Sequence, residues 1–160
     1  MILYLDTSSL VKLYLDEEHS DFVRLWADRA EILCTSRVAY PEAMAAVARR
    51  WRDGDLADEA FQAIRGALSD QWPDFSSVEL DEEVAGDLAV RYALRGFDAI
   101  HLAAALEVAA GATDVPSYFS SFDLQLNRAA REAGLEVLDA ESAPRAQESP
   151  PGATSATTEE

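Results

Sequence analysis

Four acidic side chains in this sequence stand where carboxylates could do chemistry, at predicted transitions from strand to helix. Asp6 ends an apolar run, and Asp123 follows an aromatic one. Glu42 lies in the first turn of a predicted helix, and Asp98 opens an otherwise apolar helix. In a parallel sheet such transitions gather at the carboxyl ends of the strands. We therefore expect these four acids, distant in sequence, to converge on one crevice.

Convergence of these carboxylates would favour a bound cation. Like charges a few ångströms apart raise each other's pKa, and a hard divalent ion with oxygen ligands relieves the repulsion. Such an ion, Mg²⁺ or Mn²⁺, lowers the pKa of a bound water and stabilises charge on a phosphate during in-line displacement. The four acids thus predict phosphodiester hydrolysis. Taken one at a time, each also fits a simpler interpretation, since acids at helix starts cap the helix or complement its dipole.

Two further side chains near these acids have competing interpretations. His101 follows Asp98 by about one helical turn. Because no cysteine or second histidine lies near it in sequence, we interpret it as a hydrogen-bonded core residue and not as a zinc ligand. Arg49 shares a helix face with Glu42, about 10 Å farther along the axis, and could reach a neighbouring phosphate. It could equally be a solvated charge that complements the helix dipole.

The elements that would position these residues alternate along the chain. Short apolar runs predict five strands, and helical spacing of apolar residues fills the segments between them. The predicted strands are residues 2–5, 31–34, 77–80, 115–119 and 135–138, and the predicted helices are residues 10–15, 21–30, 40–52, 57–71, 82–94, 98–110 and 124–133. Alternation of this kind predicts an α/β fold with a central parallel sheet.

Length and composition describe an ordinary globular domain. With 160 residues, 49% of them hydrophobic and 27% charged, the chain suits a single domain and neither a disordered nor a fibrous class. Cys34 is the only cysteine, which excludes an intramolecular disulfide and favours a reducing, intracellular location. We find no pattern of a signal peptide or a membrane span. Residues 1–139 form the predicted domain, and residues 140–160, which lack large apolar side chains, form a predicted disordered acidic tail.

The charge balance argues against broad nucleic-acid binding. Thirty acidic residues against thirteen basic ones give a formal charge of −17, which repels phosphate backbones and attracts cations or basic partners. The residues from Asp139 onward contribute a net four of these negative charges, so −13 remains on residues 1–138. Screening beyond about 8 Å at physiological salt lets local cations outweigh distant acids. The few basic residues are grouped on two segments: Arg49, Arg50 and Arg52, then Arg91 and Arg95.

Four sequence runs enclose the acids: LDTSSLVKLY from residue 5, PE from residue 41, RGFDAIHLAAA from residue 95 and SSFD from residue 120. Together they resemble the corresponding runs of PIN-domain ribonucleases and, more narrowly, of VapC toxins from type II toxin–antitoxin pairs. The resemblance covers about residues 1–139. It implies a three-layer α/β/α sandwich and a metal-dependent endoribonuclease toxin that hydrolyses RNA with a metal-activated water.

In such proteins, one or two Mg²⁺ or Mn²⁺ ions lie among the matching acids. By this resemblance Asp6 and Asp98 would be the main metal ligands, and Asp123 would complete the shell directly or through water. Glu42, a secondary member of the metal site, would orient or deprotonate the attacking water.

The resemblance also assigns supporting residues and partners. Ser8 and Ser121 match small hydroxyl positions and would hydrogen-bond the carboxylates or the phosphate. A cognate VapB-like antitoxin would place a basic segment across the groove, and a surface at about −13 suits such a partner. The protein would be a cytoplasmic homodimer. With so few cations, we expect weak, structure-dependent recognition of a folded RNA such as a tRNA or a ribosomal loop.

Two other functions stay open from the sequence. A phosphohydrolase could use Asp6 as its nucleophile, although Ser8 replaces the second acid of an Asp-x-Asp motif and Lys12 is the only lysine. A non-catalytic PIN-like module could serve partner binding alone, although the presence of all four acids argues against it.

Overall fold

A parallel sheet forms the centre of the fold. The computed structural model describes residues 1–138 and residue 140, so the predicted tail, apart from its first residue, lies outside the described residues. Within them, the strands follow the order β3-β2-β1-β4-β5, and all neighbours are parallel. The strands are β1 (Ile2–Leu5), β2 (Ile32–Ser36), β3 (Ser76–Val78), β4 (Ser117–Ser120) and β5 (Val137–Leu138).

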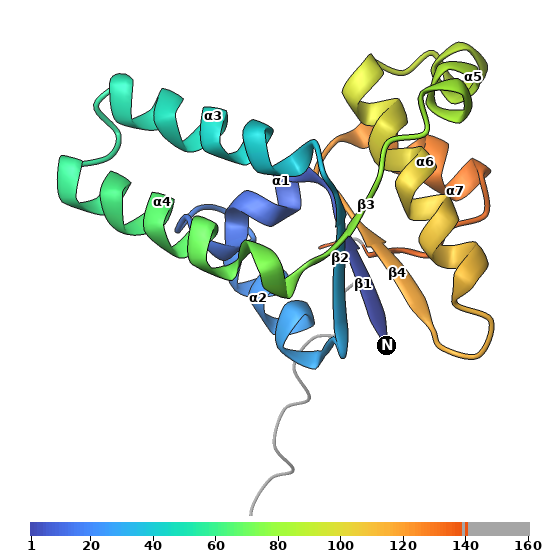
Figure 1. Cartoon of the computed structure of the whole chain (residues 1–160), viewed down its shortest axis with the longest axis horizontal. Helices are drawn as coiled ribbons and strands as arrows, with labels where there is room; N and C mark the ends of the chain where they lie inside the picture. The colour runs from blue at the N-terminus through green and yellow to red at the C-terminus, as the bar shows by residue number, and fades with distance from the viewer. Residues whose placement is uncertain (139, 141–160) are drawn as a thin grey trace, which may run out of the picture.

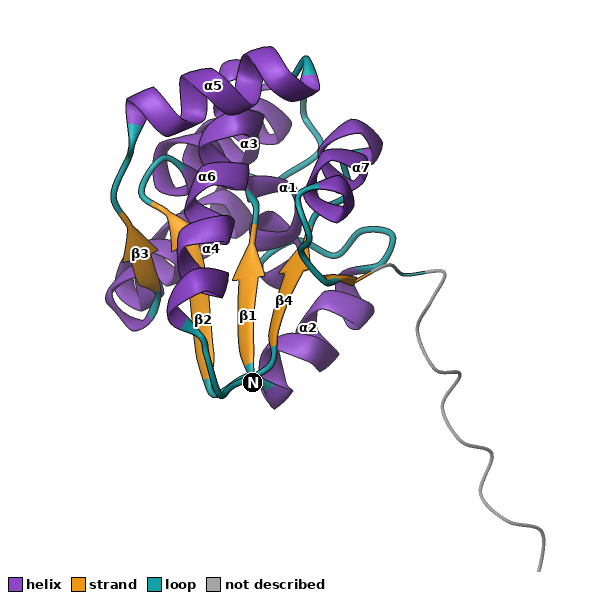
Figure 2. Ribbon diagram, turned by 90° about the vertical axis from the view of Figure 1, so that its right-hand side faces the viewer, coloured by secondary structure: helices purple, strands orange, loops and turns teal. Residues whose placement is uncertain are grey.

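Helices cover both faces of this sheet (Figure 1, Figure 2). They are α1 (Thr7–Leu10), α2 (Ser20–Arg29), α3 (Ala39–Arg52), α4 (Asp58–Gln71), α5 (Glu82–Tyr92), α6 (Gly96–Gly111) and α7 (Leu124–Glu132), with the 3₁₀ turns η1 (Val11–Leu13) and η2 (Trp72–Asp74). In Figure 1, α1 to α4 lie on one side of the strands and α5 to α7 on the other. This three-layer α/β/α sandwich confirms the predicted fold. In the described part of the chain, no helix has both the length and the apolar character needed to cross a membrane.

Apolar cores on both faces explain the continuous apolar runs. Leu3 and Leu5 of β1 pack toward α1–α4. Tyr4, on the opposite face, packs with Leu102 and Phe119 among α5–α7. Each of these side chains belongs to a residue that is at most 2% exposed. A strand buried on both faces needs apolar residues at successive positions, which is why β1 shows no polar alternation.

Element boundaries differ from the predicted ones where polar side chains make local bonds. The first helix begins at Thr7 instead of residue 10, because the Asp6 carboxylate accepts a hydrogen bond from the Ser9 backbone N–H at 2.9 Å and caps it there. The rest of the predicted helix is the turn η1. β2 runs two residues past its predicted end. Its buried Thr35 hydroxyl donates to the Leu5 carbonyl at 2.7 Å, which satisfies a polar group within the sheet.

Leu102→Ala should destabilise the fold by about 2–5 kcal/mol, because the truncation leaves a cavity in the core beneath α6. The matched control is Leu124→Ala, since Leu124 is 85% exposed. That control should change the free energy of unfolding by less than about 0.5 kcal/mol. Urea denaturation followed by circular dichroism measures both values. Equal stabilities of the two variants would contradict this assignment of the core.

Candidate active site

The four predicted acids line a single cavity at the carboxyl ends of the central strands. The cavity has a volume of about 390 Å³, and its lining includes Asp6, Glu42, Asp98 and Asp123. Asp6 follows β1, and Asp123 follows β4 as the N-cap of α7. Glu42 and Asp98 lie in the first turns of α3 and α6. The chain brings the four acids together, but the predicted strand-to-helix transition at Asp98 is wrong, because α6 follows the helix α5 and not a strand.

Asp6 is buried, with only 5% of the residue exposed. Its Oδ1 accepts hydrogen bonds from the Ser8 hydroxyl at 2.7 Å and the Ser9 N–H at 2.9 Å, and its Oδ2 accepts one from the Ser121 hydroxyl at 2.6 Å. Ser8 and Ser121 thus bind a carboxylate, which is one of the two roles expected of them. Burial raises the pKa of Asp6, and the bonds from Ser121 and Ser8 offset only part of the shift. A positive charge in the cavity would stabilise the ionised form.

Asp98 and Asp123 share one cation of this chain. Arg95 Nε donates to Asp98 Oδ2 at 2.6 Å, and Arg95 Nη2 donates to Asp98 Oδ1 at 3.2 Å and to Asp123 Oδ2 at 2.9 Å. Asp123 Oδ1 accepts the Leu126 N–H at 2.9 Å and so caps α7. The Arg95 side chain is 75% exposed, so solvent screening limits each pair to about 1 kcal/mol or less. Arg95 therefore forms only weak ion pairs with Asp98 and Asp123, and moving it away from them costs little free energy.

Glu42 belongs to a hydrogen-bonded group of enclosed side chains. Its Oε2 accepts a bond from the Thr7 hydroxyl at 2.6 Å and lies 3.1 Å from His101 Nε2. Nε2 also lies 3.0 Å from Thr7 Oγ1, and the other ring nitrogen, Nδ1, lies 3.0 Å from the Tyr4 hydroxyl. Burial acts to raise the pKa of Glu42, but the bonds from His101 and Thr7 outweigh it and the net shift is downward. Glu42 is therefore ionised at neutral pH.

Cations from η1 and α3 line another part of the cavity. Lys12 is buried; its ammonium donates to Glu17 Oε1 at 2.6 Å and lies 4.5 Å from the centre of the Phe122 ring. Arg50 donates to the other carboxylate oxygen of Glu17. Glu17 thus neutralises two of the cavity's cations. Arg49 also lines the cavity, as its predicted face on α3 implies.

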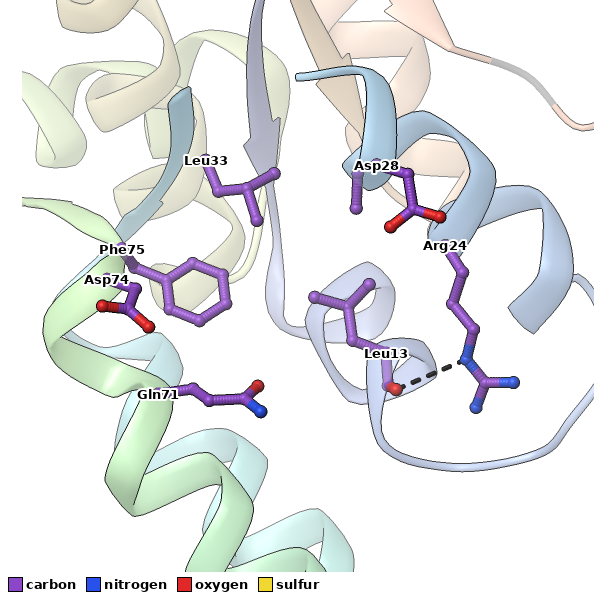
Figure 3. Close-up of a pocket in the computed structure, with 8 residues that line it drawn as sticks. Leu13, Arg24, Asp28, Leu33, Gln71, Asp74 and Phe75 are labelled. Atoms are coloured by element: carbon purple, nitrogen blue, oxygen red, sulfur yellow. Dashed lines mark hydrogen bonds between the residues drawn. The ribbon is translucent and has the colours of Figure 1, made fainter. Parts of the chain in front are cut away.

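A separate cavity of about 300 Å³ lies between η1, α2, α4 and the amino end of β2 (Figure 3). The side chains of Leu13, Leu33 and Phe75 gather around it, and Arg24 donates to the Leu13 carbonyl at 3.4 Å. The four site acids do not belong to its lining. We therefore place the chemistry in the acid-lined cavity.

Three side chains of the site have contacts that sequence reasoning missed. Thr7 and His101 bind Glu42, and Arg95 binds both Asp98 and Asp123. A signal existed for Arg95, because it precedes Asp98 by three residues, a spacing at which helical side chains meet. His101 is the hydrogen-bonded core histidine that we predicted, at 3% exposure. Its partners come from β1, α1 and α3, and no sequence spacing encodes those contacts.

Known proteins resemble this chain along most of its length. The sequence matches the PIN domain family over residues 3–132. This chain belongs to the PIN-domain family. Ribonuclease VapC45 and Ribonuclease VapC49, from two strains of Mycobacterium tuberculosis, are each 36% identical to it over 146 residues. Each alignment covers 89% of this PIN-domain chain and 99% of the relative.

Solved structures share the PIN-domain fold seen here. PAE2754 from Pyrobaculum aerophilum has a TM-score of 0.62 at 18% identity, covering 86% of this chain and 89% of its own. FitAcB from Neisseria gonorrhoeae has a TM-score of 0.61 at 18% identity, covering 87% and 97%. VapC20 from Mycobacterium tuberculosis, a sarcin-ricin loop cleaving toxin, has a TM-score of 0.56 at 17% identity, covering 83% and 95%. At these identities the likeness establishes the fold alone.

Proposed function

We propose that this PIN-domain protein is an endoribonuclease toxin that hydrolyses RNA phosphodiester bonds with a metal-activated water. The observation that carries the proposal is the single cavity lined by Asp6, Glu42, Asp98 and Asp123. The similarity to two VapC ribonucleases across 89% of the chain supports RNA as the substrate. The negative charge of the acids would hold a cation in the cavity, and that cation would bind the RNA phosphate.

The acids suit a divalent cation in donor type. Carboxylate oxygens are the ligands that Mg²⁺ and Mn²⁺ prefer. In the part of the chain that the structure describes, no three acids, histidines or cysteines are arranged to hold a metal ion, and the Arg95 guanidinium stands between Asp98 and Asp123. Asp6 and Asp98 would hold the ion, with Asp123 as a further ligand once Arg95 withdraws. Bound there, the ion would lower the pKa of a water and stabilise charge on the phosphate.

Arg95→Gln should increase the affinity of the protein for Mn²⁺ by about threefold to tenfold. The guanidinium and the ion compete for the same two carboxylates, and two exposed ion pairs of up to about 1 kcal/mol each would no longer oppose binding. Isothermal titration with Mn²⁺ measures the change in Kd.

Arg91→Gln is the control for this change. It removes the same charge from the preceding helix, where the Arg91 guanidinium lies 5.2 Å from the centre of the Tyr92 ring. The control should leave the Mn²⁺ affinity close to that of the wild type. Weaker Mn²⁺ binding in Arg95→Gln would show that Arg95 supports the ion instead of competing with it.

Other side chains of the cavity would act on the RNA and the water. Glu42, ionised and facing the cavity, would orient or deprotonate the attacking water. Arg49 would contact a neighbouring phosphate. Because Lys12 and Arg50 are already paired with Glu17, few cations are left to bind the RNA backbone. We therefore expect recognition of a folded tRNA or ribosomal RNA by shape, and weak binding of RNA in general.

The proposal extends to domain organisation, partners and location. Residues 1–139 would be the nuclease domain. The acidic groove would receive a basic segment of a cognate VapB-like antitoxin, which would inhibit the enzyme by neutralising the acids. The protein would act in the cytoplasm as a homodimer.

A nucleophilic Asp6 has less support from the geometry. Both carboxylate oxygens accept hydrogen bonds, and the residue is 5% exposed, so little room is left for attack on phosphorus. Lys12, the only lysine, donates to Glu17 and to the Glu18 carbonyl. Its ammonium group is therefore not available to stabilise a phosphorylated Asp6.

The direct test incubates the full chain with end-labelled tRNA, ribosomal RNA and an unstructured oligonucleotide. Each reaction contains Mg²⁺, Mn²⁺ or EDTA, and primer extension maps the new ends. The proposal expects cleavage at defined positions of a folded RNA with either metal and none in EDTA. Cleavage that persists in EDTA, or intact RNA under all conditions, would refute it. A protein that cleaves nothing and whose melting temperature ignores Mn²⁺ would be the non-catalytic module.

A further inference from the structure

His101 lies behind Glu42, at 3% exposure, with a partner at each ring nitrogen. We propose that His101 is a positioning residue for the reaction, whose Nε2–H holds one carboxylate oxygen of Glu42 so that the other is free for the cavity. The inference rests on the proposed function, in which Glu42 acts on the attacking water. It extends that function to a buried side chain that acts through Glu42.

Tyr4 decides which ring nitrogen of His101 carries the proton. The residue is 2% exposed, and its hydroxyl lies 3.0 Å from Nδ1. Among the described residues, that ring nitrogen is the hydrogen-bond partner of the Tyr4 hydroxyl, so the O–H can donate to the ring. Burial raises the pKa of Tyr4 well above its usual value, and the hydroxyl keeps its proton at neutral pH. Nδ1 can then accept this bond, and the ring proton that matters for Glu42 stands on Nε2, 3.1 Å from Glu42 Oε2.

The proton on His101 Nε2 faces two oxygen atoms, and the chemistry of each fixes whether it donates or accepts a hydrogen bond. Thr7 Oγ1 donates its single proton to Glu42 Oε2 at 2.6 Å, because an ionised carboxylate can only accept. The Nε2–H then points at the pair formed by Thr7 Oγ1, 3.0 Å away, and Glu42 Oε2, 3.1 Å away. The opposite tautomer would set a nitrogen lone pair against Oε2 and would leave the Tyr4 proton without its acceptor. One arrangement of protons therefore satisfies the hydrogen bonds among Tyr4, His101, Thr7 and Glu42.

This arrangement leaves Glu42 Oε1 for chemistry. No described residue donates a hydrogen bond to Oε1, and Glu42 lines the acid cavity. Two donors from α1 and α6 hold Oε2, so the carboxylate is oriented by elements other than its own helix, α3. A base held in this way presents its lone pairs in a fixed direction, which is the preorganisation that proton transfer from a positioned water requires.

The test compares two amides at position 101 of the full chain. The amide nitrogen of Gln reaches roughly as far as Nε2, whereas that of Asn reaches only as far as Nδ1. His101→Asn should lower kcat for RNA cleavage by about 10–100-fold, as the loss of a partner that orients a site ligand does, with KM little changed. His101→Gln, which can still donate to Oε2, should recover most of that loss. Equal kcat losses in the two variants, or full kcat in His101→Asn, would overturn the inference.

A second measurement does not depend on activity. It therefore tests the inference even if one of the two variants at position 101 folds poorly. Side-chain ¹⁵N NMR of the wild type should show a proton on His101 Nε2, with the His19 signals assigned by their persistence in His101→Gln. Tyr4→Phe should remove this preference for Nε2, because the donor to Nδ1 is gone. An Nδ1–H tautomer in the wild type, whose Nε2 could not donate to Glu42, would overturn the inference. Failure of the wild type to cleave any RNA would instead refute the proposed function while the tautomer stood.

Discussion

Asp6→Asn should abolish RNA cleavage and the rise in melting temperature caused by Mn²⁺, and yet give a more stable protein when metal is absent. The amide still accepts the Ser9 N–H, so the cap of α1 survives. It removes a buried negative charge that the fold tolerates poorly, since burial raises the pKa of Asp6. Activity and stability should therefore move in opposite directions.

The stability gain of Asp6→Asn should depend on pH. Because the folded-state pKa of Asp6 lies above its unfolded value, the wild type loses stability as the pH rises through the folded pKa. Asn does not titrate, so the two proteins should be similar at acid pH and diverge toward neutrality. Thermal melts in EDTA across this range measure the divergence, at about 2–4 °C per kcal/mol for a chain of this size. A variant that still cleaves RNA, or that melts below the wild type at neutral pH, would contradict the assignment.

Glu42→Gln should reduce cleavage by about 10²–10⁴-fold, the contribution typical of a positioned general base. Gln keeps the length of the side chain and still accepts a bond from Thr7 or His101, so the surroundings of the site persist. Mn²⁺ should still raise the melting temperature of this variant, because the main ligands, Asp6 and Asp98, remain. Single-turnover cleavage assays at saturating RNA measure the loss in the chemical step.

Glu83→Gln is the matched control for Glu42→Gln, because Glu83 is an exposed first-turn acid of another helix, α5. It should leave the cleavage rate close to that of the wild type. The two variants should also differ in acid stability. The pKa of Glu42 is lowered in the folded protein, so its ionised form stabilises the wild type above the unfolded pKa and that advantage is lost as the pH falls. Equal cleavage by the two variants would exclude Glu42 as the base.

The fold could be predicted because its central strand is buried on both faces. Leu3, Tyr4 and Leu5 each meet a core, so β1 reads as an unbroken apolar run that only a covered parallel sheet explains. The meeting of three acids could be predicted for the same topological reason, since they follow strands, whereas Asp98 reaches the cavity through the packing of α6. Boundaries could be predicted less well. A side-chain bond such as Thr35 to the Leu5 carbonyl lengthens β2 and depends on the register between two strands.

The contacts among the site residues could not be predicted from spacing. Glu42 and His101 are 59 residues apart, and their bond depends on how α3 and α6 approach across the end of β1. Arg95 illustrates a different failure. In the sequence it is grouped only with Arg91, but at the N-cap of α6, three residues before Asp98, its side chain pairs with Asp98 and Asp123. The hydrogen-bond partners of these side chains depend on tertiary packing, and the local sequence alone does not determine that packing.

The helix caps restrict which residues evolution can place in this site. Asp6 starts α1 and Asp123 starts α7, each with a carboxylate oxygen that also lines the acid cavity. Ser, Thr and Asn cap helices without charge, and Glu carries charge but caps poorly, so Asp alone meets both demands. Glu42 and Asp98 lie in the first turns of their helices but cap neither of them. Positions 6 and 123 should thus accept no substitution in a selected library, because any other residue would lose either the cap or the charge.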